Sequence, residues 1–340
     1  MRRDASRSAR PVSAAPILAG SLAALLAGCS GAVKRPEVAT RIATVDAARL
    51  RKHVEELARL GPRTPGRVQA SRAAVDYIVA ELERMGYRPR REGVGAAHPD
   101  EGGSMHEFEN VVAELPGAPG APVIELGAHY DTVTGSPGAD DNASGVAGVL
   151  EAARALAGSR PEKTVRFLFF ALEEHGKHGS RSHVERIRER GEELEGTIVF
   201  EMIGYASREP GSQRTPVRIP LLLSPPRTGD FIAVIGNIPS GRIGNRFESA
   251  ARRYVPELDY FSANRLGGLF RDSRRSDHEA YWDAGYRAIM LTDTANFRNP
   301  SYHQPSDTPE TLDYDFLRRV TMATAATLLE WAGVRPDGGA

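Results

Sequence analysis

Long apolar runs that end in acidic or histidine residues are the feature of this 340-residue chain that most restricts its fold. Runs of this length are typical of buried strands, and α/β proteins build their sites where such strands end. Two imidazoles and several carboxylates meeting there would hold divalent metal ions. The strings concerned are VIELGAHYD, TVRFLFFALEE and GTIVFEMIG, joined by PGADDNASG and SYHQPSDTPE in turns.

Strand-like and helix-like patterns alternate along the chain, which predicts an α/β fold. We expect a single domain with a mostly parallel or mixed central β-sheet covered by helices on both faces. The segment 91–105 is rich in Gly, His and acids and predicts a loop or hairpin tip. The expected strands are 108–115, 123–130, 165–172, 197–202, 231–235 and 288–292, and the expected helices are 45–60, 68–85, 144–156 and 316–332.

The N-terminus indicates export. A basic start precedes an apolar stretch, 14–27, that is too short to span a bilayer comfortably, and it ends in LAGC, whose Cys29 is the single cysteine. This ending resembles the lipobox of bacterial lipoprotein signal peptides. The resemblance implies a signal peptide over 1–28, a lipidated Cys29 with a tether over 29–44, and membrane attachment facing the periplasm or cell exterior. An ordinary secretory signal with a chance cysteine is the alternative. A formal net charge of zero gives no electrostatic case for nucleic-acid binding.

The first two motifs each have a structural as well as a functional interpretation. His129 and Asp131 are two residues apart at a strand end, so their side chains leave on the same side. Asp131 could accept the ring N–H of a metal-binding His129, or the two could pair without a metal. Asp140 and Asp141 lie in a turn that opens a helix, where a carboxylate could bridge two cations or cap the helix.

The Glu173–Glu174 pair is harder to explain without a cation. Adjacent carboxylates after an apolar strand repel each other in a low-dielectric setting, and a bound metal removes that cost. One could ligate metal while the other acts as general base; alternatively both reach solvent, as Glu201 could. A lone loop histidine such as His303 is usually a surface residue, and Asp277 could be a carboxylate behind the metal ligands.

The whole set, in its order along the chain, resembles the zinc aminopeptidase family with two co-catalytic metals. That group also contains glutamate carboxypeptidases, glutaminyl cyclases and the transferrin-receptor ectodomain. The resemblance covers Val45 to Trp331 and implies the zinc aminopeptidase (phosphorylase/hydrolase-like) fold, with a metallopeptidase domain over 45–333 and a tail over 334–340. The matching strings are GAHYD, PGADDNASGVA, FFALEEHGKHGS, FEMIGY, SDHEAYWDAGYRAIMLTDT and YHQPSDTPETLD.

The resemblance also implies a ligand set for two Zn²⁺ ions, with Co²⁺ or Mn²⁺ as other possible ions. Asp141 matches the carboxylate that bridges the metals, and in the family the bond after it, here Asp141–Asn142, is often cis. Glu201 stands where many relatives have Asp. Asp131 and Asp277 would lie behind the ligands. The implied ligands are His129, Asp141, Glu174, Glu201 and His303.

The implied reaction is removal of N-terminal residues from peptides with a free N-terminus. Glu173 would be the general base and Tyr302 would polarise the scissile carbonyl. A glutaminyl cyclase with one zinc and a non-catalytic lipoprotein on the same fold are the alternatives. Three arginines in one irregular segment, Arg271, Arg274 and Arg275, either attract acidic substrates or a C-terminal carboxylate, or form solvated surface.

Overall fold

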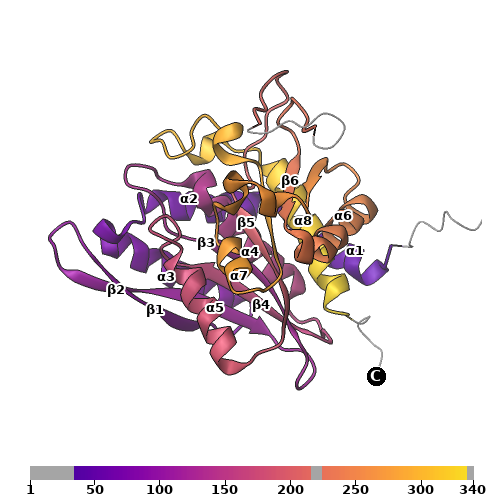
Figure 1. The fold of residues 1–340 in the computed structure, drawn as a ribbon, viewed down its shortest axis with the longest axis horizontal. Coiled ribbons are helices and arrows are strands. Elements are labelled where there is room, and N and C mark those ends of the chain that lie inside the picture. The colour runs from indigo at the N-terminus through magenta and orange to yellow at the C-terminus, as the bar shows by residue number, and fades with distance from the viewer. Residues whose placement is uncertain (1–33, 216–223, 335–340) are drawn as a thin grey trace, which may run out of the picture. The chain divides into compact units, whose positions relative to one another are not determined.

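An eight-stranded mixed β-sheet forms the centre of the described residues, 34–215 and 224–334 of this computed structural model (Figure 1). The strand order is β1-β2-β4-β3-β5-β8-β6-β7. Strands β4, β3, β5 and β8 run parallel, whereas β2 and β6 are antiparallel to their neighbours β4 and β8. The strands are β1 Arg90–Pro99, β2 Met105–Leu115, β3 Val123–His129, β4 Thr164–Phe170, β5 Leu194–Glu201, β6 Ile232–Gly236, β7 Tyr260–Ala263 and β8 Ala288–Thr292.

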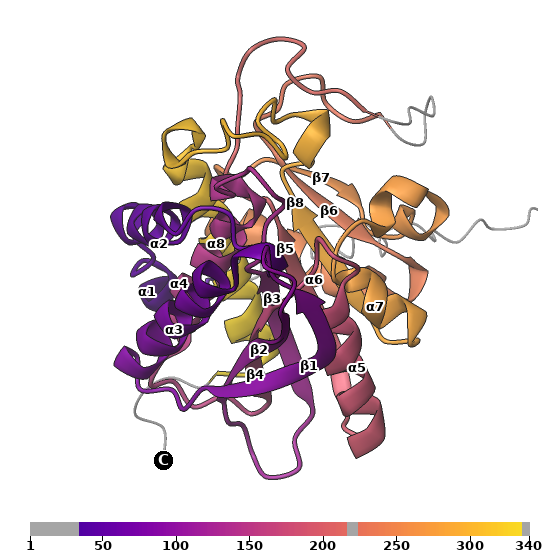
Figure 2. The ribbon, with the colours of Figure 1, turned by 90° about the vertical axis from the view of Figure 1, so that its left-hand side faces the viewer.

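Helices cover both faces of the sheet, as the sequence predicts. Helices α3, α4, α6 and α8 lie on one face and α5 and α7 on the other (Figure 2). Helix α4 packs on β3, β4 and β5, and α7 packs on β5 and β8. The helices are α1 Pro36–Ile42, α2 Ala47–Arg59, α3 Val68–Arg84, α4 Gly145–Leu156, α5 His178–Arg190, α6 Gly241–Tyr254, α7 His278–Asp283 and α8 Tyr314–Trp331.

Close packing of α4 on the sheet explains a glycine in its first turns. A Cβ added at Gly148 would come within 2.9 Å of side-chain atoms of Phe200 and Ile203. Strand β3 is buried along its whole length, as expected for a central parallel strand covered on both faces. The helix therefore sits directly against the strands whose ends carry the acidic residues.

Helices α5, α6 and α7 and strand β7 were not among the expected elements, and two segments that the sequence did assign have a different structure. Residues 91–105 are not a loop, because most of them form β1 and the start of β2, and only 100–104 make the hairpin tip. An edge strand pairs with a neighbour on one side only and can be largely polar, without alternating apolar and polar residues. Its composition therefore resembled that of a loop. Residues 36–42 lie within the predicted tether, 29–44, but form α1 and bury Val38 and Ile42 against α4 and α8.

The predicted lipidation site, Cys29, lies outside the described residues. Among the helices that the structure does describe, none is both long and apolar enough to cross a bilayer.

A buried charge network ties the far side of the sheet to α5 and α7. Glu125 on β3 is fully buried and receives four hydrogen bonds, from Arg166 Nη1 (2.8 Å), His183 Nε2 (3.1 Å), Thr197 Oγ1 (3.0 Å) and the Tyr281 hydroxyl (2.9 Å). Burial alone would raise the pKa of Glu125, but His183 and Arg166 outweigh it and hold the pKa at about 2. The carboxylate is therefore charged and paired in the folded chain.

Replacing Glu125 by Gln is expected to lower the free energy of unfolding by about 3 kcal/mol at pH 7, because the buried Arg166 and His183 each lose one of the anions with which they pair. The folded pKa lies below the usual value of 4.5, so the stability from this carboxylate is present above pH 4.5 and is lost as pH falls toward 2. In urea unfolding, the difference between wild type and variant should shrink over that range. Glu114→Gln is the matched control, since Glu114 also pairs with Arg166 but is one-third exposed; it should cost about 1 kcal/mol or less.

Candidate metal centre

The predicted site residues gather at the carboxyl ends of three neighbouring parallel strands. Strand β3 ends at His129 and β5 at Glu201, while Glu173 and Glu174 follow β4 after a short turn. Because β4, β3 and β5 are adjacent and run the same way, their ends meet at one edge of the sheet. The turn before α4 and the loop before α8 bring the remaining acidic and histidine residues to the same edge.

One group of possible ligands consists of His129, Asp141 and Glu201, all buried. The Nε2 atom of His129 lies 3.5 Å from Asp141 Oδ1 and 3.3 Å from Glu201 Oε2. Ser276 donates a hydrogen bond of 2.6 Å to the same Glu201 oxygen and so fixes the carboxylate. The extra methylene of Glu201, relative to Asp, therefore still allows its carboxylate to reach the histidine.

A second group shares Asp141 with the first. His303 Nε2 lies 3.1 Å from Asp141 Oδ2 and 3.1 Å from Glu174 Oε1. The two oxygens of Asp141 thus face two different histidines, which is the arrangement expected of a bridging carboxylate. The Asp141–Asn142 peptide bond is cis, as the resemblance implies.

The donor atoms of both groups suit a zinc ion. Within each group the ligand atoms lie within 4.8 Å of one another. His129 Nε2, Asp141 Oδ1 and His303 Nε2 are buried and have no hydrogen-bond partner among the described residues. Imidazole nitrogen and carboxylate oxygen are common zinc ligands, and a cation would satisfy these atoms together. The residues present therefore fit a metal at each group.

Proton affinities at the site show a surplus of buried negative charge. Burial and the nearby Asp141 raise the pKa of Glu174 to about 7. Burial alone would lower the pKa of His303, but the Asp141 and Glu174 carboxylates outweigh it and raise the pKa to about 10. A bound cation would replace these protons, so the centre favours positive charge.

Glu173 and Tyr302 lie beside the two groups. Glu173 is only 8 % exposed, and burial raises its pKa well above the usual range, although His129 opposes the shift. The Tyr302 ring stacks on the His303 ring with the centroids 3.7 Å apart. Arg275 donates a hydrogen bond of 3.0 Å to the Tyr302 hydroxyl oxygen.

Strained backbone adjoins the candidate ligands. Leu172, Met202 and His303 have φ values of 58°, 50° and 60° although none is glycine. Leu172 directly precedes Glu173, and Met202 directly follows Glu201. Left-handed conformations at non-glycine residues carry a cost that the surrounding structure must bear, and they cluster at functional sites.

The two carboxylates predicted to lie behind the ligands, Asp131 and Asp277, are both buried. His129 Nδ1 lies 3.2 Å from the Asp131 carbonyl oxygen and 3.5 Å from its carboxylate. The Asp131 carboxylate mainly accepts the backbone N–H groups of Glu173 and Glu174, at 3.0 and 3.2 Å, so it positions that pair as well as the histidine. Asp277 is fully buried directly before α7, where burial raises its pKa to about 7.

Sequence reasoning missed the residues that hold the Asp141 turn. The Asp307 carboxylate accepts the backbone N–H groups of Asp140 and Asp141, at 2.9 and 3.1 Å. The Asn142 side chain accepts N–H groups from Gly145 and Met202 and thereby joins the turn to the end of β5. An aspartate in a polar loop looks like solvent-exposed surface, and the one signal was that Asp307 lies in YHQPSDTPETLD, a string that carries the family resemblance without marking this residue as buried.

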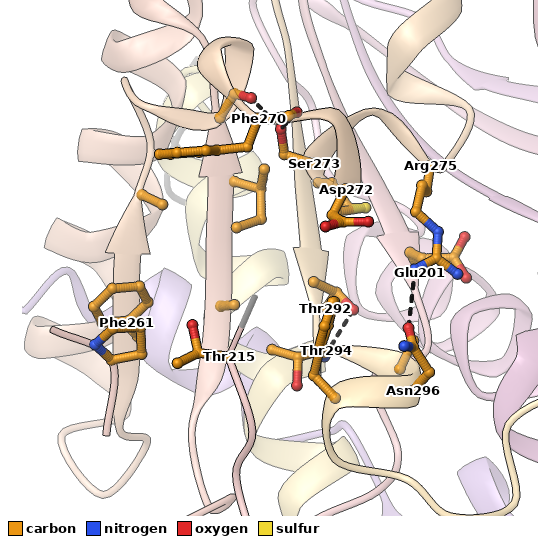
Figure 3. A pocket seen from close by; sticks show the side chains of 18 of the residues that line it. Glu201, Thr215, Phe261, Phe270, Asp272, Ser273, Arg275, Thr292, Thr294 and Asn296 are labelled. Carbon is orange, nitrogen blue, oxygen red and sulfur yellow. Dashed lines mark hydrogen bonds between the residues drawn. The ribbon is translucent and has the colours of Figure 1, made fainter. Parts of the chain in front are cut away.

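A pocket of about 960 Å³, part of it open to solvent, runs from Glu201 across the neighbouring strands. Its floor is one face of β8, β6 and β7, to which Met290, Ile235 and Phe261 contribute. Figure 3 shows Glu201 and Arg275 together at one end and Phe261 and Thr215 at the other. The pocket thus connects the candidate metal centre with an apolar surface near the edge of the sheet.

Comparisons with known proteins identify similar sequences and similar folds. The chain is 37% identical to the uncharacterized protein YfbL of Escherichia coli, over 76% of this chain and 80% of that protein. It is 28% identical to a probable zinc metalloprotease of Pyricularia oryzae, over 86% of this chain and 66% of that protein. Among solved structures, the LapA aminopeptidase of Legionella pneumophila shares the fold, with a TM-score of 0.71 at 18% identity over 87% of this chain and 74% of that one. A glutaminyl cyclase of Porphyromonas gingivalis also shares it, with a TM-score of 0.63 at 21% identity over 84% and 99% of the two chains.

The family assignment rests on a family model that matches more than half of the chain, together with the 37% identity to the E. coli protein. The family model for peptidase family M28 matches residues 110–328, which contain every candidate ligand. The resemblance inferred from the sequence is therefore confirmed: this chain belongs to peptidase family M28.

Proposed function

We propose that this chain is a di-zinc exopeptidase of the aminopeptidase type, which removes N-terminal residues from peptides. The observation that carries the proposal is the position of Asp141, with one carboxylate oxygen facing His129 and the other facing His303. A carboxylate shared between two groups of ligands supports two adjacent ions rather than one. The probable zinc metalloproteases and the aminopeptidase among its relatives support the same chemistry.

His129, Asp141 and Glu201 would hold one zinc ion, and Asp141, Glu174 and His303 the other. When bound, the ions supply Lewis-acid polarisation of the scissile carbonyl and lower the pKa of water. The three carboxylates and two neutral imidazoles of this set would largely offset the charge of two divalent ions. Glu201, which lines the pocket, would also attract the free N-terminal amine of a substrate.

Glu173 is the proposed general base. Its carboxylate is buried at the same strand edge as the ligands, and its backbone N–H is fixed by Asp131. It would accept a proton from the attacking water and later deliver that proton to the leaving amine. The adjacent Glu174 differs in role, because its Oε1 lies 3.1 Å from His303.

Tyr302 is the proposed donor to the developing oxyanion. Arg275 donates into the Tyr302 hydroxyl oxygen, so the hydroxyl proton remains available for another acceptor. Stacking on His303 holds the phenol beside the second group of ligands. A hydrogen bond that strengthens as the carbonyl oxygen gains charge lowers the barrier to hydrolysis.

Zinc binding and peptide hydrolysis test this function together. The protein, stripped of metal and titrated with zinc, should bind two ions per chain and then release amino acids from aminoacyl anilides and short peptides. The P. gingivalis glutaminyl cyclase among the structural relatives makes that activity the specific alternative. Binding of a single zinc with release of ammonia from N-terminal glutamine would favour the cyclase. Inertness of the zinc-loaded protein on a broad peptide panel would contradict the peptidase.

A further inference from the structure

The structure separates the three arginines of the irregular segment before α7. Arg274 forms ion pairs with Glu279 and Asp283, and Arg271 is exposed and does not line the pocket. Arg275 alone of the three lines the pocket beside Glu201 (Figure 3). Of these three arginines, Arg275 is therefore the one that lies next to the candidate metal centre.

The partners of Arg275 are neutral. Its Nη1 donates to Asn296 Oδ1 at 2.9 Å and its Nη2 to the Tyr302 hydroxyl at 3.0 Å, and its guanidinium carbon lies 5.7 Å from the Tyr302 ring centroid. Across residues 34–215 and 224–334, no carboxylate lies within ion-pair distance of this guanidinium. These two hydrogen bonds hold the guanidinium in place and leave most of its N–H donors for an anion.

The floor of the pocket that Arg275 lines is apolar. Side chains two residues apart on a strand share a face, so Ala233 and Ile235 of β6 lie beside Phe261 of β7 and Met290 of β8. Phe231 and Phe270 also line the pocket. This surface suits an apolar side chain of about the size of Leu or Phe, and it lies away from the charged groups at the Glu201 end.

We propose that Arg275 binds a carboxylate of the substrate, and that the preferred substrates are short peptides whose C-terminal carboxylate reaches it. An apolar side chain of the same peptide occupies the floor of β6, β7 and β8. The proposal rests on the peptidase function proposed above and narrows it to di- and tripeptides with a free C-terminus.

The contact between Arg275 and Tyr302 sets the length of such a substrate. The Tyr302 hydroxyl is the proposed donor to the scissile carbonyl, and Arg275 touches the same hydroxyl. A carboxylate at Arg275 is therefore within about one or two residues of the scissile bond, since an extended chain advances roughly 3.5 Å per residue. In a longer peptide the C-terminal carboxylate would lie beyond Arg275 and could not bind it.

The charged side chains that line the pocket leave it with a cationic surplus. Arg214 and Asp272 also line the pocket, and Glu201 belongs to the proposed ligand set. With Glu201 counted against the metal ions, two arginines face one aspartate. An acidic side chain is the second possible source of the carboxylate, but the apolar floor suits an apolar side chain on the bound residue and leaves its terminal carboxylate for Arg275. The terminal carboxylate is therefore the favoured source.

A matched pair of dipeptides tests the proposal in the zinc-loaded protein. Wild type should hydrolyse Leu-Phe at least tenfold faster than Leu-Phe amide, measured as kcat/KM. Arg275→Gln should reduce kcat/KM for the free acid at least tenfold more than for the amide, mainly through KM. Arg275→Lys should retain part of the preference, because it keeps the charge but not the planar fork. Arg271→Gln is the control and should keep the wild-type preference.

Two results would overturn the assignment. Equal hydrolysis of acid and amide by wild type means that no terminal carboxylate is recognised. An equal loss on both substrates in Arg275→Gln means that Arg275 acts only through Tyr302. Glu- and Gln-anilides test an acidic side chain as the source of the carboxylate. If Arg275→Gln lost a wild-type preference for the Glu-anilide over the Gln-anilide but kept the preference for Leu-Phe over Leu-Phe amide, Arg275 would bind an acidic side chain and not the C-terminal carboxylate. A wild-type protein that cleaves none of these compounds contradicts the proposed function itself.

Discussion

Glu173→Gln is expected to lower kcat for peptide hydrolysis about 10²- to 10⁴-fold, which is the usual contribution of a general base. The substitution keeps the size and hydrogen-bonding shape of the side chain but removes the group that accepts the proton of water. Glu173 belongs to neither group of candidate ligands, so zinc content should stay at the wild-type value. Steady-state hydrolysis of a leucine anilide by the zinc-loaded proteins measures the loss.

Glu185→Gln on α5 is the matched control, because Glu185 is exposed on the surface of the helix and should leave kcat unchanged. Metal analysis and thermal unfolding of both variants separate a catalytic effect from a loss of zinc or of fold. If Glu173→Gln kept most of its activity with full zinc content, the proton would have to be taken by another group, and the proposed role of Glu173 would be wrong.

The strands that the sequence predicts well are those buried on both faces. The runs before His129 and Glu201 are almost wholly apolar, and no competing pattern explains them, so β3 was predictable to within one residue and β5 to within three. The edge of the sheet was harder. Strand β1 is half polar and carries Gly93, and β7 is only four residues long, so neither shows a period that distinguishes a strand from a loop.

It was also predictable from the buried strands that the residues of the candidate site would lie close together. His129, Glu173 and Glu201 each follow a buried strand, and parallel strands bring such positions to one edge. The supports of the site were not predictable, since Asp307 acts through backbone N–H groups that any residue could supply. Arg63 is a further example: it is fully buried and donates to the carbonyls of Tyr130 and Gly138, yet it lies in an ordinary polar turn of the sequence.

Dependence on zinc should also appear in stability. Zinc that binds only the folded chain, at a free concentration about 1,000 times its Kd, adds roughly 4 kcal/mol to the free energy of unfolding. For a domain of roughly 290 residues, whose entropy of unfolding is about 0.6 kcal/mol/K, that corresponds to an increase in Tm of roughly 6 to 7 °C for each bound ion. Removing zinc with a chelator should reverse the shift, as followed by differential scanning calorimetry.

Asp141→Asn should abolish most of this increase, because Asp141 is the one residue common to both groups of candidate ligands and an amide is a poor replacement for a bridging carboxylate. The exposed Asp259→Asn is the control and should respond to zinc as wild type does. The Tm of each protein without zinc is measured first, so that the increase caused by zinc is separated from any effect of Asp141→Asn on the fold itself. An undiminished increase in Tm with zinc in this variant would place the metals elsewhere and remove the basis of the shared-carboxylate centre.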